Sequence, residues 1–206
     1  MISVGEAGRH SDGGIFAHSA FGCAVNENSL GLPEDLKVPN SAVTLPHVFI
    51  GDAAFSLKNN FMRPYPGRYL PLQQGVFNYR LSRARRTIEN SFGILVARWR
   101  IFLRPIIAHP DNVMKATLAA CALHNFVKKS DNRYCPSGFA DSCDRDGVIL
   151  PGEWRNDGQG AGLLPWTARD TRAQRKSAGQ IRDTFAKYFM SPVGEVEWQY
   201  RHVTGT

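Results

Sequence analysis

The chain has 206 residues, of which 43% are hydrophobic and 21% charged, and this ordinary globular composition excludes a wholly disordered or fibrous protein. Its formal net charge of +7 favours an acidic partner such as nucleic acid over a neutral metabolite. No stretch approaches the roughly 18 apolar residues of a membrane span, and no secretory leader is recognisable, so we expect no membrane partner and no secretion.

Short apolar segments alternate with glycine- and proline-rich connections in the first part of the chain. Residues 1–4 are apolar and run into a glycine-rich stretch, which predicts the end of a strand that enters a loop. A helix is expected over residues 15–26, followed by a connection over residues 28–45. Residues 47–50 form the clearest strand, and because their apolar residues do not alternate, we expect burial on both faces in a parallel or mixed central sheet.

Asp52 comes directly after this expected strand. In open α/β sheets ligands bind at the carboxyl ends of strands, which makes Asp52 a candidate functional acid. The same position is typical of an Asx turn or of the N-cap of a helix over residues 53–61, and position alone favours that structural role.

The basic excess lies almost entirely in residues 78–104, which hold seven arginines and a single acid, Glu89. Apolar residues recur there at steps of three or four and predict an amphipathic helix that begins at an Asn78 N-cap and ends near Arg104, before Pro105. The expected buried stripe consists of Leu81, Ala84, Ile88, Phe92, Leu95, Trp99 and Phe102.

The arginines of this helix have two interpretations. A basic amphipathic helix usually presents a solvated face. Arginine also offers a planar fork that suits phosphate, whereas a solubilising face would mix in Lys and Glu. Glu89 is expected at the border of the stripe, with Gly93 leaving open space over its carboxylate one turn further on. A lone Glu there serves a cation or pairs with Arg85 or Arg86.

Two further helices are expected, over residues 110–128 and 171–189, with a loop or linker over residues 130–170. His124 is interpreted as a core or capping residue before a ligand. The four cysteines include no Cys-x-x-Cys pair and are expected to be reduced, and a zinc site built from His124, Cys135 and Cys143 would match no standard spacing.

Several short motifs occur in a fixed order along the chain. They are GDAAFSL (51–57), RPYPG (63–67), FNYRLSRAR (77–85), IENSFG (88–93) and LHN (123–125). Together with residues 8–16 and 188–199, they resemble the PIF/Harbinger transposases and their domesticated nuclease relatives. Each motif is weak alone, but their order and spacing are fairly specific and span nearly the whole chain.

This resemblance implies an α/β, RNase H-like (DDE transposase/nuclease) fold, incomplete at the N-terminus and with a C-terminal helical extension. Its parts would be a partial nuclease domain over residues 1–129, the linker over 130–170, and a helix and tail over 171–206 that dock on the domain.

The resemblance also implies chemistry. Two Asp and one Glu of this family hold two Mg²⁺ or Mn²⁺ ions, which activate the attacking oxygen and stabilise the leaving oxygen of a DNA phosphodiester. Asp52 matches the second aspartate and Glu89 the glutamate. The first aspartate belongs to a strand upstream of residues 11–13 and is expected to have no counterpart here. Asp12 matches a different aspartate of the family, which lies on a loop, and it is a candidate for an accessory residue.

Two hypotheses follow. The chain is part of a metal-dependent DNA endonuclease of transposase origin, or it is a catalytically inactive domesticated or truncated relic that acts as a DNA-binding or protein-interaction module. Because this sequence has two of the three carboxylates of the family, we expect it to have no nuclease activity by itself. DNA contacts are predicted for Arg80, Arg83, Arg85 and Arg86. The resemblance implies nuclear localisation and a Myb-like DNA-binding partner protein.

Overall fold

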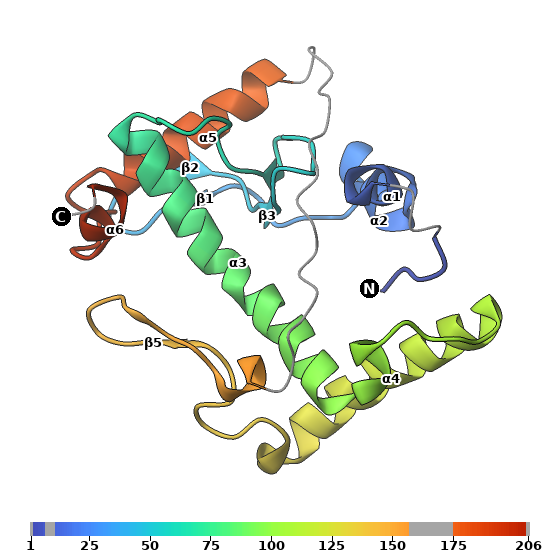
Figure 1. Cartoon of the computed structure of the whole chain (residues 1–206). Helices are drawn as coiled ribbons and strands as arrows, with labels where there is room; N and C mark the ends of the chain where they lie inside the picture. Colours follow the sequence, from blue (N-terminus) through green and yellow to red (C-terminus); the bar gives the residue numbers. More distant parts are fainter. Residues whose placement is uncertain (1, 7–10, 157–174, 205–206) are drawn as a thin grey trace. The chain divides into compact units, whose positions relative to one another are not determined.

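The computed structural model describes residues 2–6, 11–156 and 175–204 (Figure 1). The chain divides into two compact units. We call Met1–Ala7 with Arg86–Leu163 the α4 unit, and Gly8–Arg85 with Leu164–Thr206 the α5 unit. Helix α3 (Leu72–Arg98) contributes its first half to the α5 unit and its second half to the α4 unit, and each unit is described by itself.

The α5 unit combines short helices with two small sheets. Besides the first half of α3, its elements are α1 (Asp12–His18), α2 (Ala20–Asn26), β1 (Leu36–Lys37), β2 (Thr44–Leu45), β3 (Phe49–Ile50), β4 (Phe61–Met62), α5 (Arg175–Phe189) and α6 (Gln199–Thr204). Strands β1 and β2 pair antiparallel, whereas β3 and β4 pair in parallel, with Phe49 opposite Phe61.

The helix predicted over residues 15–26 is divided in two. Ser19 has an extended backbone, accepts a hydrogen bond from the Gly22 amide at 3.0 Å, and so caps the start of α2. Its own amide donates to the carbonyls of Ile15 and Phe16 and ends α1. Ser19 therefore serves both helix ends, which the apolar pattern alone does not reveal.

The strand predicted at residues 47–50 is present as β3, and its parallel pairing is confirmed. The prediction that this strand is buried on both faces is wrong, because Ile50 is 37% exposed. The described residues form three two-stranded sheets in place of the expected central sheet, and residues 2–6 contain no strand. Two strands of two residues each are too short to form a central sheet that other elements cover on both faces. One face of β3 is therefore exposed to solvent.

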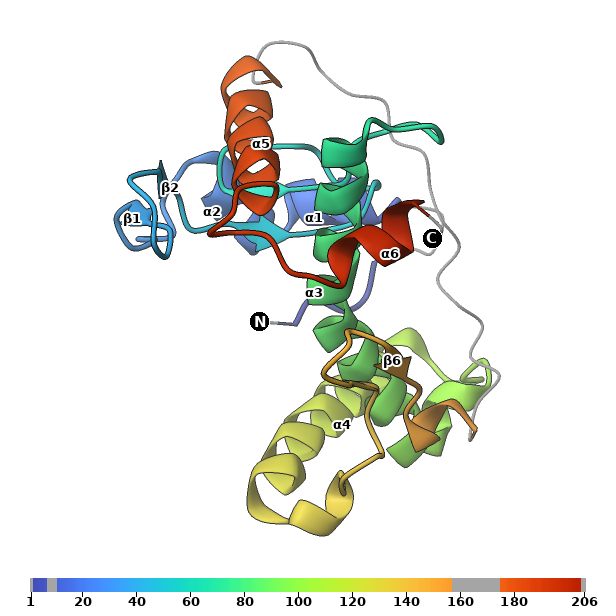
Figure 2. The same cartoon turned by 90° about the vertical axis from the view of Figure 1, so that its left-hand side faces the viewer.

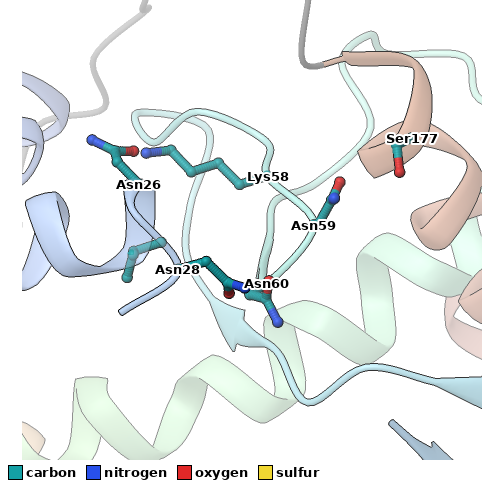
Figure 3. Close-up of a pocket in the computed structure, with 7 residues that line it drawn as sticks. Asn26, Asn28, Lys58, Asn59, Asn60 and Ser177 are labelled. Carbon is teal, nitrogen blue, oxygen red and sulfur yellow. The ribbon is translucent and has the colours of Figure 1, made fainter. Parts of the chain in front are cut away.

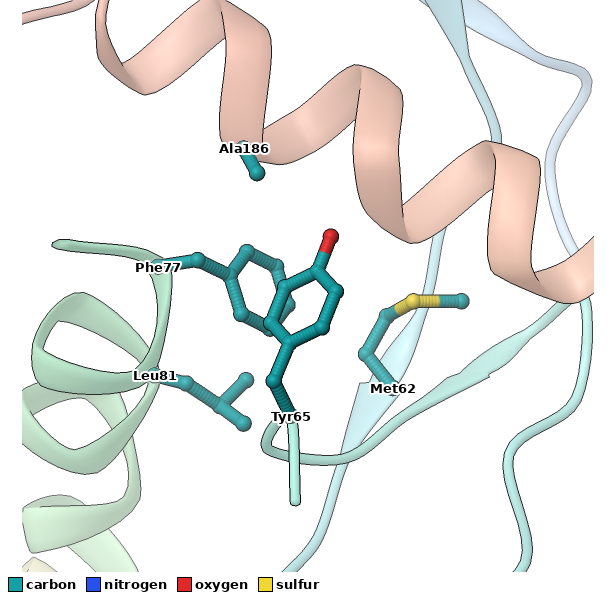
Figure 4. Close-up of a cluster of buried hydrophobic side chains, with 5 residues drawn as sticks. All are labelled: Met62, Tyr65, Phe77, Leu81 and Ala186. Carbon is teal, nitrogen blue, oxygen red and sulfur yellow. The ribbon is translucent and has the colours of Figure 1, made fainter. Parts of the chain in front are cut away.

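A cluster of buried side chains holds α5 against the first half of α3 (Figure 4). Its buried members are Met62, Tyr65, Phe77, Leu81 and Ala186. The rings of Tyr65 and Phe77 meet edge to face, 5.3 Å between centroids. Ile181, Phe185 and Phe189 of α5 are partly buried against this cluster, and residues 171–174 of the predicted helix lie outside the described residues.

Helix α3 begins at Leu72, six residues before the predicted start, and ends at Arg98. Asn78 is no cap: its side-chain oxygen accepts from the Tyr65 amide at 2.7 Å and its amide donates to the Tyr65 carbonyl at 3.0 Å. The asparagine thus ties the preceding proline-rich loop to the helix. The sequence alone does not distinguish an asparagine that caps a helix from one that bonds the backbone of another segment.

The predicted buried stripe of α3 is largely wrong. Leu81 is buried, but Ile88 and Phe92 are 50% and 54% exposed. The first half of the helix is covered by α5, whereas in the second half Gly93 meets Trp154. Because each half of α3 is covered by different partners within its own unit, a single predicted stripe does not describe the burial of the whole helix.

The α4 unit contains a long helix and a segment of short elements. They are the 3₁₀ turn η1 (Arg100–Leu103), α4 (Pro110–Ser130), the 3₁₀ turn η2 (Asn132–Tyr134), β5 (Ser142–Cys143), β6 (Ile149–Leu150) and the 3₁₀ turn η3 (Glu153–Arg155). The prediction of α4 is confirmed, with Pro110 at its first position and lysines in its last turn. Within the expected linker, β5 and β6 pair antiparallel (Figure 2), and residues 157–170 lie outside the described part. None of the described helices combines the length and apolarity that crossing a bilayer requires.

Replacing Phe77 by Ala should destabilise the protein by about 3–5 kcal/mol, because this 2%-exposed ring fills the centre of the cluster in Figure 4. The matched control is Phe126→Ala, whose ring is on α4 and 69% exposed, with an expected change within about 0.5 kcal/mol. Urea unfolding followed by fluorescence measures both. Equal losses in the two variants would show that this cluster is not the core of the α5 unit.

Candidate functional site

Asp52 lies at the carboxyl end of β3, where the chain turns sharply. The preceding Gly51 is buried, and its amide donates to the Met62 carbonyl at 2.9 Å. A side chain at Gly51 would collide with the rings of Phe55 and Phe61. One oxygen of Asp52 accepts from the Ala54 amide at 2.8 Å, so the carboxylate closes an Asx turn and no helix follows.

The second oxygen of Asp52 faces α3. Its Oδ2 lies 3.5 Å from Nη2 of Arg85, and the two side chains are 42% and 24% exposed. An open pair at this distance is screened by water and contributes little to stability. Asp52 is therefore a half-exposed carboxylate that has a structural bond on one oxygen and a loosely held cation beside the other.

Asp12 is the first residue of α1 and is exposed. The next residue, Gly13, approaches the turn after Asp52 so closely that a Cβ there would lie 2.4 Å from the Ala54 carbonyl oxygen. The start of α1 is thus packed against the Asx turn, which brings the segments that carry the two predicted acids together within the α5 unit. The accessory role of Asp12 stays a prediction.

Arg63 organises the same turn, a role that the sequence did not reveal. Its Nη1 donates to the carbonyl of Phe55 at 3.0 Å and to that of Ala53 at 3.4 Å. Burial lowers the pKa of its guanidinium from the usual value. Every residue has a backbone carbonyl, so the sequence does not show which carbonyls an arginine will bond. Arg63 nevertheless belongs to the RPYPG motif.

Glu89 belongs to the α4 unit and is exposed on α3. The space expected over Gly93 is filled, because a Cβ at this glycine would lie 2.4 Å from the ring of Trp154. The indole nitrogen of Trp154 donates to the side-chain oxygen of Asn90 at 3.0 Å. A residue of the expected linker therefore occupies the site that the helical spacing left vacant.

Asp141 anchors that segment to α3. It is buried, its amide donates to the side-chain oxygen of Asn90 at 3.0 Å, and its carboxylate accepts from the Gly152 amide at 2.8 Å and from Arg155 Nε at 2.8 Å. The hydrogen bonds from Arg155 are the main cause that lowers the pKa of Asp141. In return Asp141 raises the pKa of Arg155, and the charge of Glu89 adds to that shift.

The four arginines predicted to contact DNA differ in their surroundings. Arg80 donates to the Gly194 carbonyl at 2.6 Å and stacks 4.1 Å over the ring of Phe189, and burial lowers its pKa. Its guanidinium is thus used to hold the C-terminal segment, because that segment packs on this part of α3. A free, phosphate-facing Arg80 is therefore not what the structure presents.

The other three arginines are also engaged or partly covered. Arg83 stacks 4.0 Å over Trp198, and its Nη1 donates to the hydroxyl of Tyr79 at 3.1 Å. Arg85 pairs with Asp52. Within the described residues, Nε and Nη1 of the half-buried Arg86 are buried and have no hydrogen-bond partner. The interpretation of these arginines as a face that is merely exposed to solvent therefore does not describe this part of the helix.

His124 is a core residue, as interpreted. It is buried in α4, its Nδ1 lies 2.8 Å from the Tyr134 hydroxyl, and burial lowers its pKa. Tyr134 also accepts a hydrogen bond from the indole nitrogen of Trp99 at 2.8 Å.

The described residues do not fit a complete two-metal centre. Among them, no group of three or more His, Cys, Asp or Glu side chains is placed to hold a metal ion. Asp52 offers one half-exposed carboxylate in the α5 unit, and Glu89 offers one exposed carboxylate in the α4 unit. Each could serve as a single ligand, but a pair of divalent ions needs several oxygen ligands.

Comparison with known proteins agrees with the motifs that surround Asp52 and Glu89. The family model described as DDE superfamily endonuclease matches residues 1–125, more than half of the chain. The chain belongs to this family, which confirms the predicted relationship. It is also 32% identical over 94 residues to "Protein ALP1-like" of Arabidopsis thaliana. That alignment covers 44% of this chain and 23% of the relative, so the chain spans less than a quarter of the relative's length. No solved structure matches.

The sequence predicts that the C-terminal helix and tail dock on the domain, but it does not reveal the residues that make these contacts. Helix α6 was not predicted, and its first residue, Gln199, is fully buried and accepts from Arg80 at 3.3 Å. Trp198, which stacks on Arg83, belongs to the same segment. For residues 188–199 the sequence offers a resemblance to the family, which identifies no individual contact.

Asp141→Asn should change the dependence of stability on pH. Because the pKa of Asp141 is lowered in the folded state, its stabilising effect is present above the ordinary value near 4 and is lost as the pH falls through the lowered value. We expect a loss of about 1–3 kcal/mol at pH 7 and a weaker dependence between pH 5 and 2. Urea unfolding over this range measures both, with the exposed Asp146→Asn as control. Parallel curves for wild type and Asp141→Asn would contradict the assignment.

Gly13→Ala should separate α1 from the turn that carries Asp52. The added methyl would meet the Ala54 carbonyl, which belongs to the backbone and yields less readily than a side chain. We expect a loss of about 1–3 kcal/mol. The control is Gly179→Ala in α5, where a Cβ meets nothing within 4 Å and the gain should be about 0.5–1 kcal/mol. Thermal unfolding compares them, and a neutral Gly13→Ala would contradict the close packing.

Proposed function

We propose that the chain supplies two metal ligands, Asp52 and Glu89, to a divalent-metal-dependent DNA endonuclease of transposase origin. Membership of the DDE superfamily endonuclease family supports nuclease activity at the family level. The observation that carries the assignment is Asp52: a half-exposed carboxylate at the end of a parallel strand, held by an Asx turn. The reaction is phosphodiester hydrolysis, in which carboxylates hold Mg²⁺ or Mn²⁺ and no histidine base is needed.

Glu89 is the acid of α3 best suited to a second ligand. It is the one acidic residue in the helix sequence and is exposed. Its assignment as a ligand rests on its match to the glutamate of the family within the IENSFG motif.

The proposed roles of the arginines differ. Arg83, Arg85 and Arg86 are proposed to contact the DNA backbone, where a planar guanidinium matches a phosphate. Arg80 is proposed to act through structure alone, since its guanidinium bonds the Gly194 carbonyl. The RNase H-like architecture, nuclear localisation and a Myb-like DNA-binding partner complete the proposal and rest on the family resemblance.

The test measures nicking of supercoiled plasmid by the protein in its native full-length form, with Mg²⁺ or Mn²⁺ and with EDTA. Asp52→Ala and Glu89→Ala should each reduce metal-dependent nicking by about a hundredfold or more, because a ligand to the ion is lost. The control variants are Asp146→Ala and Glu34→Ala, which remove exposed acids elsewhere and should leave nicking unchanged. Calorimetry with Mn²⁺ checks that the first two variants also bind the ion less tightly.

Unchanged nicking in either Asp52→Ala or Glu89→Ala would overturn the assignment of that residue. Tight binding to duplex DNA that falls steeply with salt, together with neither cleavage nor an effect of Mg²⁺, would instead favour the non-catalytic DNA-binding module.

A further inference from the structure

A polar pocket of about 300 Å³ opens on the α5 unit (Figure 3). It lies between the end of α2, the turn that precedes β4 and the first turn of α5. Its polar lining side chains are Asn26, Asn28, Lys58, Asn59, Asn60 and Ser177. This size is at the lower end of small-ligand pockets.

Two of the four asparagines have a structural explanation. Asn28 has φ of 54°, a conformation that asparagine tolerates better than most residues. The amide of Asn60 donates to the His47 carbonyl at 3.1 Å. Asn26 and Asn59 have neither feature, and within the described residues their side chains make no hydrogen bond. Both are exposed, and their donor and acceptor groups are available to a ligand.

Lys58 is the charged member of the lining, and no acidic side chain accompanies it there. Its ammonium lies 5.9 Å over the ring of Phe16, and burial lowers its pKa. Figure 3 shows the lysine extending toward Asn26. Among the described residues no carboxylate pairs with it, so the pocket has a partly desolvated cation that favours an anionic group.

A cation beside free carboxamides matches the chemistry of a nucleotide. Asparagine offers a donor and an acceptor in one plane, which pairs with the N6/N7 edge of adenine, and an ammonium binds phosphate. We infer that this pocket binds one unpaired nucleotide of a DNA strand, with Lys58 on the phosphate and Asn26 and Asn59 on the edge of the base.

The inference deepens the proposed function and rests on it for the origin of the nucleotide. The same connection between β3 and β4 carries Asp52 at its start and Lys58 with Asn59 at its end. A DNA strand that is cut by a site containing Asp52 would thus have a place on this connection for one of its unstacked nucleotides.

The test uses the 206-residue chain in EDTA, so that cleavage plays no part. Deoxyadenosine monophosphate is titrated while NMR follows the side-chain amide signals of the asparagines. The signals of Asn26 and Asn59 should shift, whereas that of the exposed Asn112 on α4 should not. Deoxyadenosine and inorganic phosphate, titrated separately, should each bind about tenfold more weakly than the nucleotide.

Lys58→Met keeps an unbranched side chain and removes the charge, and it should weaken binding of the nucleotide about tenfold or more. Asn59→Ala should weaken it about fivefold. Their controls are Lys37→Met and Asn112→Ala, at exposed positions outside the pocket, with no expected change. Thermal unfolding verifies that each variant is folded, and a labelled single-stranded hexamer of DNA should lose affinity in the same order.

Equal binding by Lys58→Met and Lys37→Met would overturn the inference, as would inorganic phosphate binding as tightly as the nucleotide. If the pocket variants bind normally while Asp52→Ala has lost nicking, the nucleotide site is wrong and the proposed function stands. If the nucleotide binds as expected but Asp52→Ala still nicks DNA, the proposed ligand is wrong and the pocket stands.

Discussion

The burial of the first half of α3 under the C-terminal segment is the constraint on which the α5 unit depends. Phe77 and Leu81 share one cluster with Ala186 of α5, although more than a hundred residues separate them in the sequence. Arg80 strengthens the same contact through Gly194 and Phe189. Because an arginine buried against a carbonyl and a ring loses water, it is stable there only while these partners stay in place. The C-terminal segment is therefore part of the core rather than an appendage.

This packing changes what a basic helix can be expected to do. An arginine-rich helix is easily interpreted as a solvated or DNA-facing surface, since a sequence shows charge but not what covers it. Here the guanidinium of Arg83 stacks on Trp198, and Arg85 faces a carboxylate. A planar, weakly hydrated guanidinium is well suited to such contacts, which a lysine would serve poorly. Packing thus explains part of the bias toward arginine, beside the phosphate contacts proposed above.

What could be predicted from the sequence was local. Helix α4 follows from Pro110, its apolar spacing and its terminal lysines, and β3 with Asp52 at its end follows from a short apolar run closed by Gly51. The start of α3 and its buried stripe could not be predicted in this way. Asn78 bonds the backbone of Tyr65, and Trp154 fills the space beside Gly93. Both partners are remote in sequence, and periodicity within a helix contains no information about them.

The two oxygens of Asp52 have different surroundings, which bears on the metal-ligand role proposed for this residue. The hydrogen bond from the Ala54 amide uses one oxygen and fixes the direction of the side chain. The side chain would therefore lose less conformational entropy when it binds a ligand. The other oxygen faces Arg85 at a distance and exposure that make the ion pair weak. A cation that binds this oxygen therefore displaces little. The structural role of Asp52 and the metal-ligand role proposed for it are therefore compatible, since the Asx turn uses one oxygen and the proposed role would use the other.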